Sequence, residues 1–218
     1  LEVVLHASPR HTRVLEAFRA YLEILGLATD FDRRLYAGRL CFLPVRSPAE
    51  KMRDLAKFSF LRVAREMPKL RPLSPVRSYS IPSTFSPDLP DEPPVNPDVR
   101  AAVFDGGLAE IPSLAPWTSS HDAGDVGAPH PDCLHHGACV TSALLFGSLV
   151  RDEPADRPYA HVDHYRVLDD QYHQDDDLFD VLRRIQTVLQ GGRHEFVNLS
   201  IGPDLAIEDD EVHAWTAV

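Results

Sequence analysis

Apolar and polar residues in the first part of the chain follow first a strand pattern and then a helical one. An apolar run over residues 2–6 comes before Ser8 and Pro9, which suit the N-cap and first position of a helix. Gly26 is a typical C-terminal stop. The apolar positions between these signals recur at helical spacing: Val14, Phe18, Leu22 and Leu25. The pattern predicts a strand followed by a helix.

The next apolar segments complete a small α/β domain. Residues 30–36 and 39–45 read as two strands with a glycine at the turn between them. A second helix is predicted over 47–58, where the opening Ser-Pro-Ala-Glu forms a capping box. A last strand follows over 60–66. The resulting order βαββαβ predicts a ferredoxin-like sandwich of two helices on a four-stranded sheet.

A proline-rich segment then divides the chain. Residues 72–97 contain eight prolines, which exclude a helix and a central strand there. We therefore predict a front domain over 1–73, a linker or extended arm over 74–98, and a back domain over 99–218.

Strands and helices alternate differently in the back domain. Apolar runs predict strands over 101–104, 161–168 and 196–199. Helical patterns are predicted over 137–150, over 178–189 and from residue 212 onward. Such alternation implies a parallel sheet with helices on both faces, which binds its ligands beyond the carboxyl ends of the strands. The predicted fold class is therefore α/β in both domains.

Composition narrows the classes of protein to consider. Of the 218 residues, 44% are apolar, which suffices for a buried core, and no window reaches the roughly 18 consecutive apolar residues of a membrane span. The N-terminus lacks the pattern of a signal peptide. Three cysteines are too few for a disulfide framework, so we expect a reducing, cytoplasmic location.

Charge is distributed unevenly along the chain. Residues 1–73 hold 14 Lys and Arg against 8 Asp and Glu, a net charge of +6, whereas the other residues hold 8 against 25, a net charge of −17. Oppositely charged domains can attract each other, although two independently solvated surfaces are an equal alternative. The total of −11 argues against a nucleic acid as partner, and a membrane is not expected either.

Polar residues follow the carboxyl ends of two strands of the predicted parallel sheet, where such sheets bind their ligands. Asp105 comes directly after one strand, and Ser200-Ile201-Gly202 comes directly after another. His136 would begin the helix between them, where the helix dipole is expected to lower the pKa of the ring and favour the neutral form of a general base. A buried carboxylate beside that ring would hold its tautomer and stabilise the imidazolium.

Three motifs, in this order, resemble the subtilisin family of serine peptidases. Residues 103–107, Val-Phe-Asp-Gly-Gly, resemble the family's strand that ends in the catalytic aspartate. Residues 136–142, His-Gly-Ala-Cys-Val-Thr-Ser, are similar to its His-Gly-Thr-His-Val-Ala-Gly helix start. Residues 196–202, Phe-Val-Asn-Leu-Ser-Ile-Gly, are similar to the strand that ends in Ser-Leu-Gly. Gly106 in place of Ser or Thr, and Ala138-Cys139 in place of Thr-His, are departures from the family pattern.

The resemblance implies an endopeptidase that acts on polypeptides. Asp105 would orient His136, His136 would act as base and then acid, and Ser200, Ile201 and Gly202 would bind substrate backbone. No Gly-Thr-Ser motif carrying a nucleophile occurs, so we expect the chain to be truncated before it and to require the missing C-terminal catalytic part as partner. No cofactor is expected; the resemblance allows calcium, but no oxygen-ligand loop in the sequence indicates it.

The same resemblance gives the front domain a role. Subtilisin propeptides share the βαββαβ order and act as chaperone and inhibitor of the catalytic domain. The segment over 67–73 would then lead into an arm that lies in the substrate groove as a product-like strand, paired with backbone near Ser200 to Gly202. A separate accessory domain is the alternative.

Two other functions remain open from the sequence. Five zinc-type ligands crowd into ten residues, although their spacing matches no standard pair of ligand pairs. They are His130, Cys133, His135, His136 and Cys139. The second alternative is a degenerate peptidase that keeps the groove and serves as a protein-interaction module.

Overall fold

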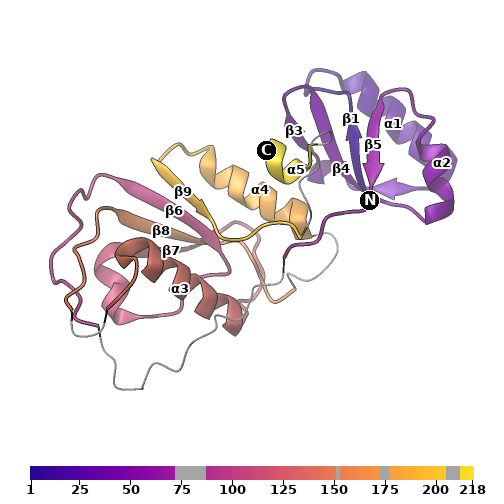
Figure 1. Cartoon of the computed structure of the whole chain (residues 1–218). Coiled ribbons are helices and arrows are strands. Elements are labelled where there is room, and N and C mark those ends of the chain that lie inside the picture. Colours follow the sequence, from indigo (N-terminus) through magenta and orange to yellow (C-terminus); the bar gives the residue numbers. More distant parts are fainter. Residues whose placement is uncertain (72–86, 151–152, 172–176, 205–211) are drawn as a thin grey trace. The chain divides into compact units, whose positions relative to one another are not determined.

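The computed structural model describes residues 1–71, 87–150, 153–171, 177–204 and 212–218. The chain is a mixed α/β protein with one antiparallel and one parallel sheet (Figure 1). It divides into two compact units: the first comprises Leu1–Leu70, His173–Arg183 and Pro203–Val218, and the second comprises Arg71–Tyr172 and Arg184–Gly202. Within the described residues, each helix is too short or too polar to cross a membrane.

The antiparallel sheet belongs to the first unit. Its strands are β1 (Glu2–Leu5), β2 (Ala28–Thr29), β3 (Leu35–Ala37), β4 (Leu40–Arg46) and β5 (Leu61–Arg65). The sheet order is β2-β4-β1-β5, and β3 also pairs with β4. All of these pairings are antiparallel. The strand predicted over 30–36 is largely wrong: a 3₁₀ turn occupies Phe31–Arg33, and only the end of the range belongs to a strand, β3, while β2 lies before it.

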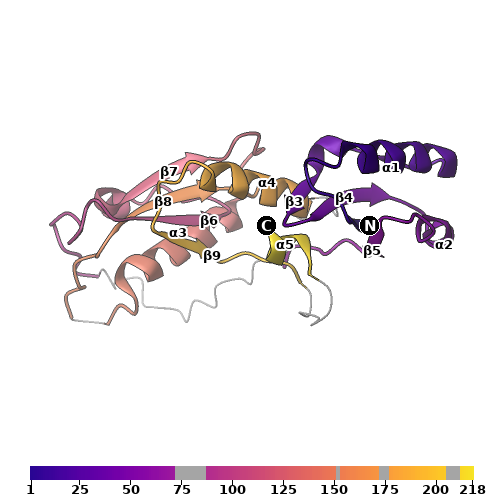
Figure 2. The ribbon, with the colours of Figure 1, turned by 90° about the horizontal axis from the view of Figure 1, so that it is seen from above.

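Helix α1 (Thr12–Leu25) runs along one face of this sheet (Figure 2). Phe18 and Leu22 are buried from it, and the helix ends at Gly26, whose φ of 67° is the left-handed conformation that glycine adopts easily. The predicted start at Ser8 is wrong. The backbone N–H of Ser8 instead donates to His11 Nδ1, and the helix begins after His11.

The second predicted helix is much shorter than its sequence pattern suggested. A 3₁₀ turn over Ala49–Lys51 leads into α2 (Met52–Leu55), which buries Leu55 against the α1 face of the sheet. The capping box is wrong, because the Ser47 hydroxyl donates to the carbonyl oxygen of Pro48 and Pro48 occupies the N-cap position.

The other face of the antiparallel sheet packs against segments from the end of the chain. Val4 and Phe42 lie in one apolar cluster with Leu178, Phe179 and Ala214. Leu178 and Phe179 belong to α4 (Asp177–Leu189), and Ala214 begins α5 (Ala214–Ala217). Burial of each large side chain contributes about 2 kcal/mol, so both faces of this sheet are fixed mainly by apolar packing.

The parallel sheet belongs to the second unit. Its strands are β6 (Arg100–Asp105), β7 (Thr118–Asp122), β8 (His161–Arg166) and β9 (Phe196–Leu199), in the order β7-β8-β6-β9 (Figure 1). All three pairings are parallel, as the alternation of strands and helices predicted. Strand β7 was missed, because Thr-Ser-Ser-His-Asp has no apolar residue.

Helix α3 (Pro131–Phe146) covers one face of the parallel sheet. Alternate residues of β6, Ala101 and Val103, share an apolar cluster with Leu145 of the helix and Val162 of β8. The helix begins six residues before the predicted start at Gly137. His130 is its N-cap, and its Nδ1 accepts from the backbone N–H of Asp132.

Part of the predicted linker over 74–98 is packed on the second unit. The backbone N–H groups of Val95 and Asn96 donate to the carbonyl oxygens of Pro158 and Tyr159, each at a distance of 2.8 Å. The indole N–H of Trp117 donates to the Glu92 carbonyl over 2.9 Å. The portion over 74–86 lies outside the described residues, so its assignment as an arm stays a prediction.

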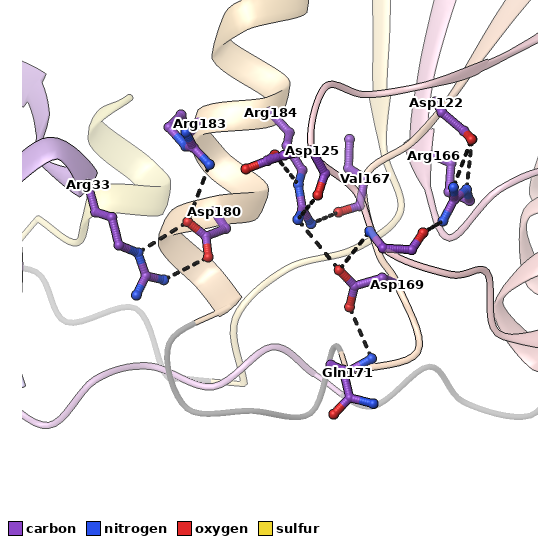
Figure 3. Close-up of polar contacts among 11 residues, drawn as sticks. Arg33, Asp122, Asp125, Arg166, Val167, Asp169, Gln171, Asp180, Arg183 and Arg184 are labelled. Carbon is purple, nitrogen blue, oxygen red and sulfur yellow. Dashed lines mark hydrogen bonds and ion pairs between the residues drawn. The ribbon is translucent and has the colours of Figure 1, made fainter. Parts of the chain in front are cut away.

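Two arginines of the described residues fix neighbouring loops and helix turns (Figure 3). Arg184 in the second half of α4 donates to the carbonyl of Val167 over 2.8 Å and forms ion pairs with Asp125 and Asp169. In the first unit, Arg33 makes a two-point contact with Asp180 at 2.9 and 3.1 Å. These contacts fix the loops that follow β7 and β8 and the first half of α4.

Candidate active site

Asp105 is the last residue of β6 and lies at the carboxyl edge of the parallel sheet. Its side chain is completely buried, and Oδ1 accepts the backbone N–H of Gly106 over 2.6 Å. Its carbonyl accepts the N–H of Val167 over 2.8 Å, which ties the end of β6 to the loop after β8. The carboxylate is therefore held in a fixed position.

His136 of α3 contacts this carboxylate directly. Its Nδ1 lies 2.8 Å from Asp105 Oδ2 and 3.0 Å from Oδ1. The side chain of His136 is 18% exposed, so it is only partly accessible. The two side chains that the sequence predicted to meet, 31 positions apart, are thus brought together.

Two expectations about His136 are wrong. It lies in the second turn of α3, not at the helix start, because the helix begins at Pro131. Its pKa is raised rather than lowered, because the hydrogen bond to Asp105 outweighs the effect of partial burial. The carboxylate therefore stabilises the imidazolium form of the ring.

Glycines allow α3 to come this close to the loop after β6. A Cβ at position 137 would lie 1.9 Å from the Gly107 carbonyl oxygen, and a Cβ at position 106 would lie 2.2 Å from Cys133 Cβ. Both distances are far below any real contact. Glycine at 106, a departure from the family pattern, therefore matches the packing of Cys133 in α3 against this loop.

The predicted substrate-binding residues follow β9, which is the neighbour of β6 in the sheet. Ile201 is buried, whereas the Ser200 hydroxyl is exposed and donates to Asn198 Oδ1 over 2.6 Å. Within the described residues, Ser200 makes no hydrogen bond to His136. The structure therefore gives Ser200 no contact with the dyad.

Backbone pairing joins Gly202 and its neighbours to an N-terminal segment. The N–H of Arg71 donates to the Gly202 carbonyl over 2.7 Å. Leu70 and Pro203 form an antiparallel bridge, and the N–H of Asp204 donates to the Lys69 carbonyl over 2.8 Å. A short stretch over 69–71 thus pairs with the segment 202–204. The predicted pairing of the arm itself with Ser200 to Gly202 stays a prediction, because residues 72–86 lie outside the described residues.

The five residues of zinc-ligand type make separate contacts and do not form one cluster. His130 caps α3, Cys133 is buried behind Gly106, His136 contacts Asp105, and Cys139 Sγ lies 3.9 Å from His135 Nε2. Among the described residues, no group of three or more His, Cys, Asp and Glu side chains is arranged to hold a metal ion. Burial raises the pKa of the Cys139 thiol, which disfavours the thiolate ligand.

Sequence reasoning missed two polar clusters on β8. His164 is buried beside α3, and its Nδ1 lies 2.8 Å from Thr141 Oγ1. The carboxylate of Asp163, the residue before His164, forms hydrogen bonds with Arg100, with His121 at 3.3 Å and with His194 at 3.0 Å. Burial opposes ionisation of Asp163, but the hydrogen bonds from Arg100 and His121 outweigh it and lower its pKa to about 2. The run of alternating polar residues in a predicted strand was the available signal.

The candidate site is therefore identified by the contacts of Asp105 and His136 alone. No family model, curated protein or solved structure matches the chain.

Proposed function

We propose that the chain contributes two members of an Asp-His-Ser triad to a subtilisin-type serine endopeptidase. The observation that carries the proposal is the 2.8 Å hydrogen bond between His136 Nδ1 and the buried carboxylate of Asp105 at the carboxyl edge of a parallel sheet. The nucleophilic serine would be supplied by polypeptide that follows residue 218.

The dyad has the properties that acyl transfer needs. A neutral ring that donates from Nδ1 to Asp105 keeps the lone pair of Nε2 free to accept the proton of a serine hydroxyl. The imidazolium formed in that step is stabilised by the adjacent carboxylate, consistent with the raised pKa of His136. The same ring would then return the proton to the leaving amine.

Strand order supports the proposed division into a propeptide-like and a catalytic part. In the first unit, two helices cover one face of an antiparallel sheet. Its strand order is β5-β1-β4, and both β2 and β3 pair with β4. A ferredoxin-like βαββαβ domain would have its strands in a corresponding order, which supports the proposal for residues 1–73. The four parallel strands of the second unit would form the first part of a subtilisin-like sheet.

The pairing of Lys69–Arg71 with Gly202–Asp204 supports a peptide-binding role for the segment after β9. Extended peptides bind by adding a strand, and the backbone supplies most of the affinity. The segment of the chain that occupies these positions would act as a product-like inhibitor. Polypeptide is the corresponding substrate class.

Strand β9 is the last strand of the parallel sheet among the described residues, which supports the proposed association with a further catalytic part. Phe196, Val197 and Leu199 are 61%, 45% and 46% exposed. Beside them lies a cavity of about 390 Å³, lined mainly by apolar side chains that include Leu144 and Tyr159. Additional strands from polypeptide beyond residue 218 would cover this edge.

Activity of the extended protein tests the proposal. We would express the chain with the polypeptide that follows Val218 in its reading frame and measure hydrolysis of a denatured protein. His136→Ala is expected to lower the rate by at least about 1,000-fold, because the general base is lost. His135→Ala, which changes an exposed histidine on the same helix, is the matched control. Unchanged hydrolysis in His136→Ala would overturn the proposal.

A non-catalytic peptide-binding module is the second candidate. It is favoured by the strand pairing at Gly202, which requires no nucleophile. In that case the extended protein would bind peptides but His136→Ala and wild type would be equally inactive. No specific observation favours a zinc protein.

A further inference from the structure

His164 of β8 lies next to the Asp105–His136 pair and contacts neither of them by a hydrogen bond among the described residues. It is fully buried, and its Nδ1 forms a 2.8 Å hydrogen bond with Thr141 Oγ1, which is also fully buried. In the parallel ladder His164 is opposite Val103, two positions before Asp105. The contact therefore joins α3 to the sheet directly below the carboxylate.

The His164 ring also meets α3 at a second point. A Cβ on Gly137 would lie 2.8 Å from His164 Cε1, so the ring packs against the bare backbone at that position. Gly137 and Thr141 are one helical turn apart and on the same face of α3. Gly137 follows His136 in sequence, so His164 fixes the helix at the turn that carries the proposed base.

A buried histidine at this position has an energetic cost, because one of its ring nitrogens has no hydrogen-bond partner among the described residues. Nε2 of His164 is buried and has no hydrogen-bond partner within the described part of the chain. Burial lowers the pKa of the ring to about 4, so it is neutral near pH 7 and does not compete with His136 for the charge of Asp105. An apolar side chain of similar size would avoid the unsatisfied nitrogen.

We propose that His164 is a positioning residue for the Asp105–His136 pair. Its hydrogen bond to Thr141 and its contact at Gly137 set the distance between α3 and the sheet, and this distance holds His136 Nδ1 on the carboxylate. The consequence for catalysis depends on the peptidase proposed above, whereas the coupling to His136 does not.

The pKa of His136, followed by NMR titration of the 218-residue chain, measures the coupling. Asp105→Asn defines the full effect of losing the carboxylate, which is expected to lower the pKa of His136. Thr141→Val removes the hydroxyl, and His164→Phe removes the imidazole while it keeps a ring. Each is expected to lower the pKa of His136 by at least half of the change seen in Asp105→Asn.

Thr118→Val is the matched control. It also removes a threonine hydroxyl from the second unit, where Thr118 Oγ1 donates to the carbonyl of Leu114, a residue outside α3, at a distance of 3.0 Å. It should leave the pKa of His136 unchanged.

Each outcome decides the proposal. If His164→Phe does not fold, Thr141→Val alone decides. A folded Thr141→Val protein whose His136 titrates as in wild type would overturn it, and so would an equal shift in Thr118→Val. An inactive extended protein would count against the peptidase but would leave this coupling intact, so the two failures are distinguishable.

Discussion

The two sheets bury very different side chains. Among the described residues, the antiparallel sheet buries one acidic side chain and no basic side chain or histidine: Glu2, which is paired with Arg65. The parallel sheet buries four side chains of these kinds: Asp105, Asp163, His164 and Arg166. Isolated buried charge is destabilising unless it is paired. The antiparallel sheet is thus organised for packing, whereas the parallel sheet keeps polar groups at the edge where α3 brings His136.

The largest expected effect comes from the apolar packing of the antiparallel sheet. Phe42 is fully buried against the α4 and α5 cluster, so Phe42→Ala should lower the free energy of unfolding by about 4 kcal/mol. Phe60, which is 47% exposed, is the control, and Phe60→Ala should cost less than about 1 kcal/mol. Urea unfolding measures both. Similar losses in the two variants would contradict the comparison.

A methyl group at position 137 tests the close contact in the parallel unit. Because its Cβ would collide with the Gly107 carbonyl, Gly137→Ala should destabilise the protein by about 3 kcal/mol and lower the pKa of His136. Gly26→Ala meets open space and keeps the left-handed helical conformation with φ 67° and ψ 30°, so it should cost only about 1 kcal/mol. A pKa of His136 that is unaffected by Gly137→Ala would show that the helix can shift without losing the carboxylate.

Acidification should weaken the parallel unit through His164. Its pKa in the folded protein, about 4, is below the unfolded value of about 6.5, so its contribution is complete above pH 6.5 and is lost as pH falls toward 4. Between pH 7 and pH 4.5 this loss amounts to about 2 kcal/mol. His136 acts in the opposite direction, because its pKa is raised and its contribution is lost as pH rises.

Urea unfolding of wild type and His164→Phe at pH 7 and pH 4.5 measures the His164 contribution. The variant should lose about 2 kcal/mol less than wild type over this interval. The same pH dependence in both proteins would mean that other groups cause the acid sensitivity.

The smallest expected effect is that of a partly exposed ion pair in the first unit. Arg33 and Asp180 are joined by two hydrogen bonds and are 20% and 29% exposed (Figure 3). A double-mutant cycle with Arg33→Ala and Asp180→Ala should give a coupling of about 1 kcal/mol, reduced in high salt. A coupling as large as the loss in Phe42→Ala would contradict the view that this unit is held by apolar packing.

Elements with a strong apolar period could be predicted from the sequence, and elements made by polar residues could not. The end of α1 at Gly26 and the strand before Asp105 follow from local patterns. Strand β7 has no apolar residue and exists because β8 offers it a partner. The strand predicted over 30–36 begins only at Leu35, because the Asp30 side chain accepts the N–H of Asp32 and starts a 3₁₀ turn.

The candidate site was predictable in part. A strand that ends in Asp105 and a helix that carries His136 placed both groups at one sheet edge. The length of α3 was not predictable from its small residues, so the position of His136 within the helix and the direction of its pKa shift were both wrong. Polar residues in the strand predicted over 161–168 were a local signal, but the role of His164 was not predictable, because it depends on contacts with Thr141 and Gly137 of α3.

The contact between the Gly107 carbonyl and Gly137 also has an evolutionary consequence. Because no side chain fits between them, any related chain that carries a larger residue at the position of Gly137 must have moved its helix outward. In such a chain, the residue at the position of His136 would no longer contact the carboxylate at the position of Asp105. The residue at this single position would therefore indicate whether a related chain keeps the contact between the histidine ring and the carboxylate.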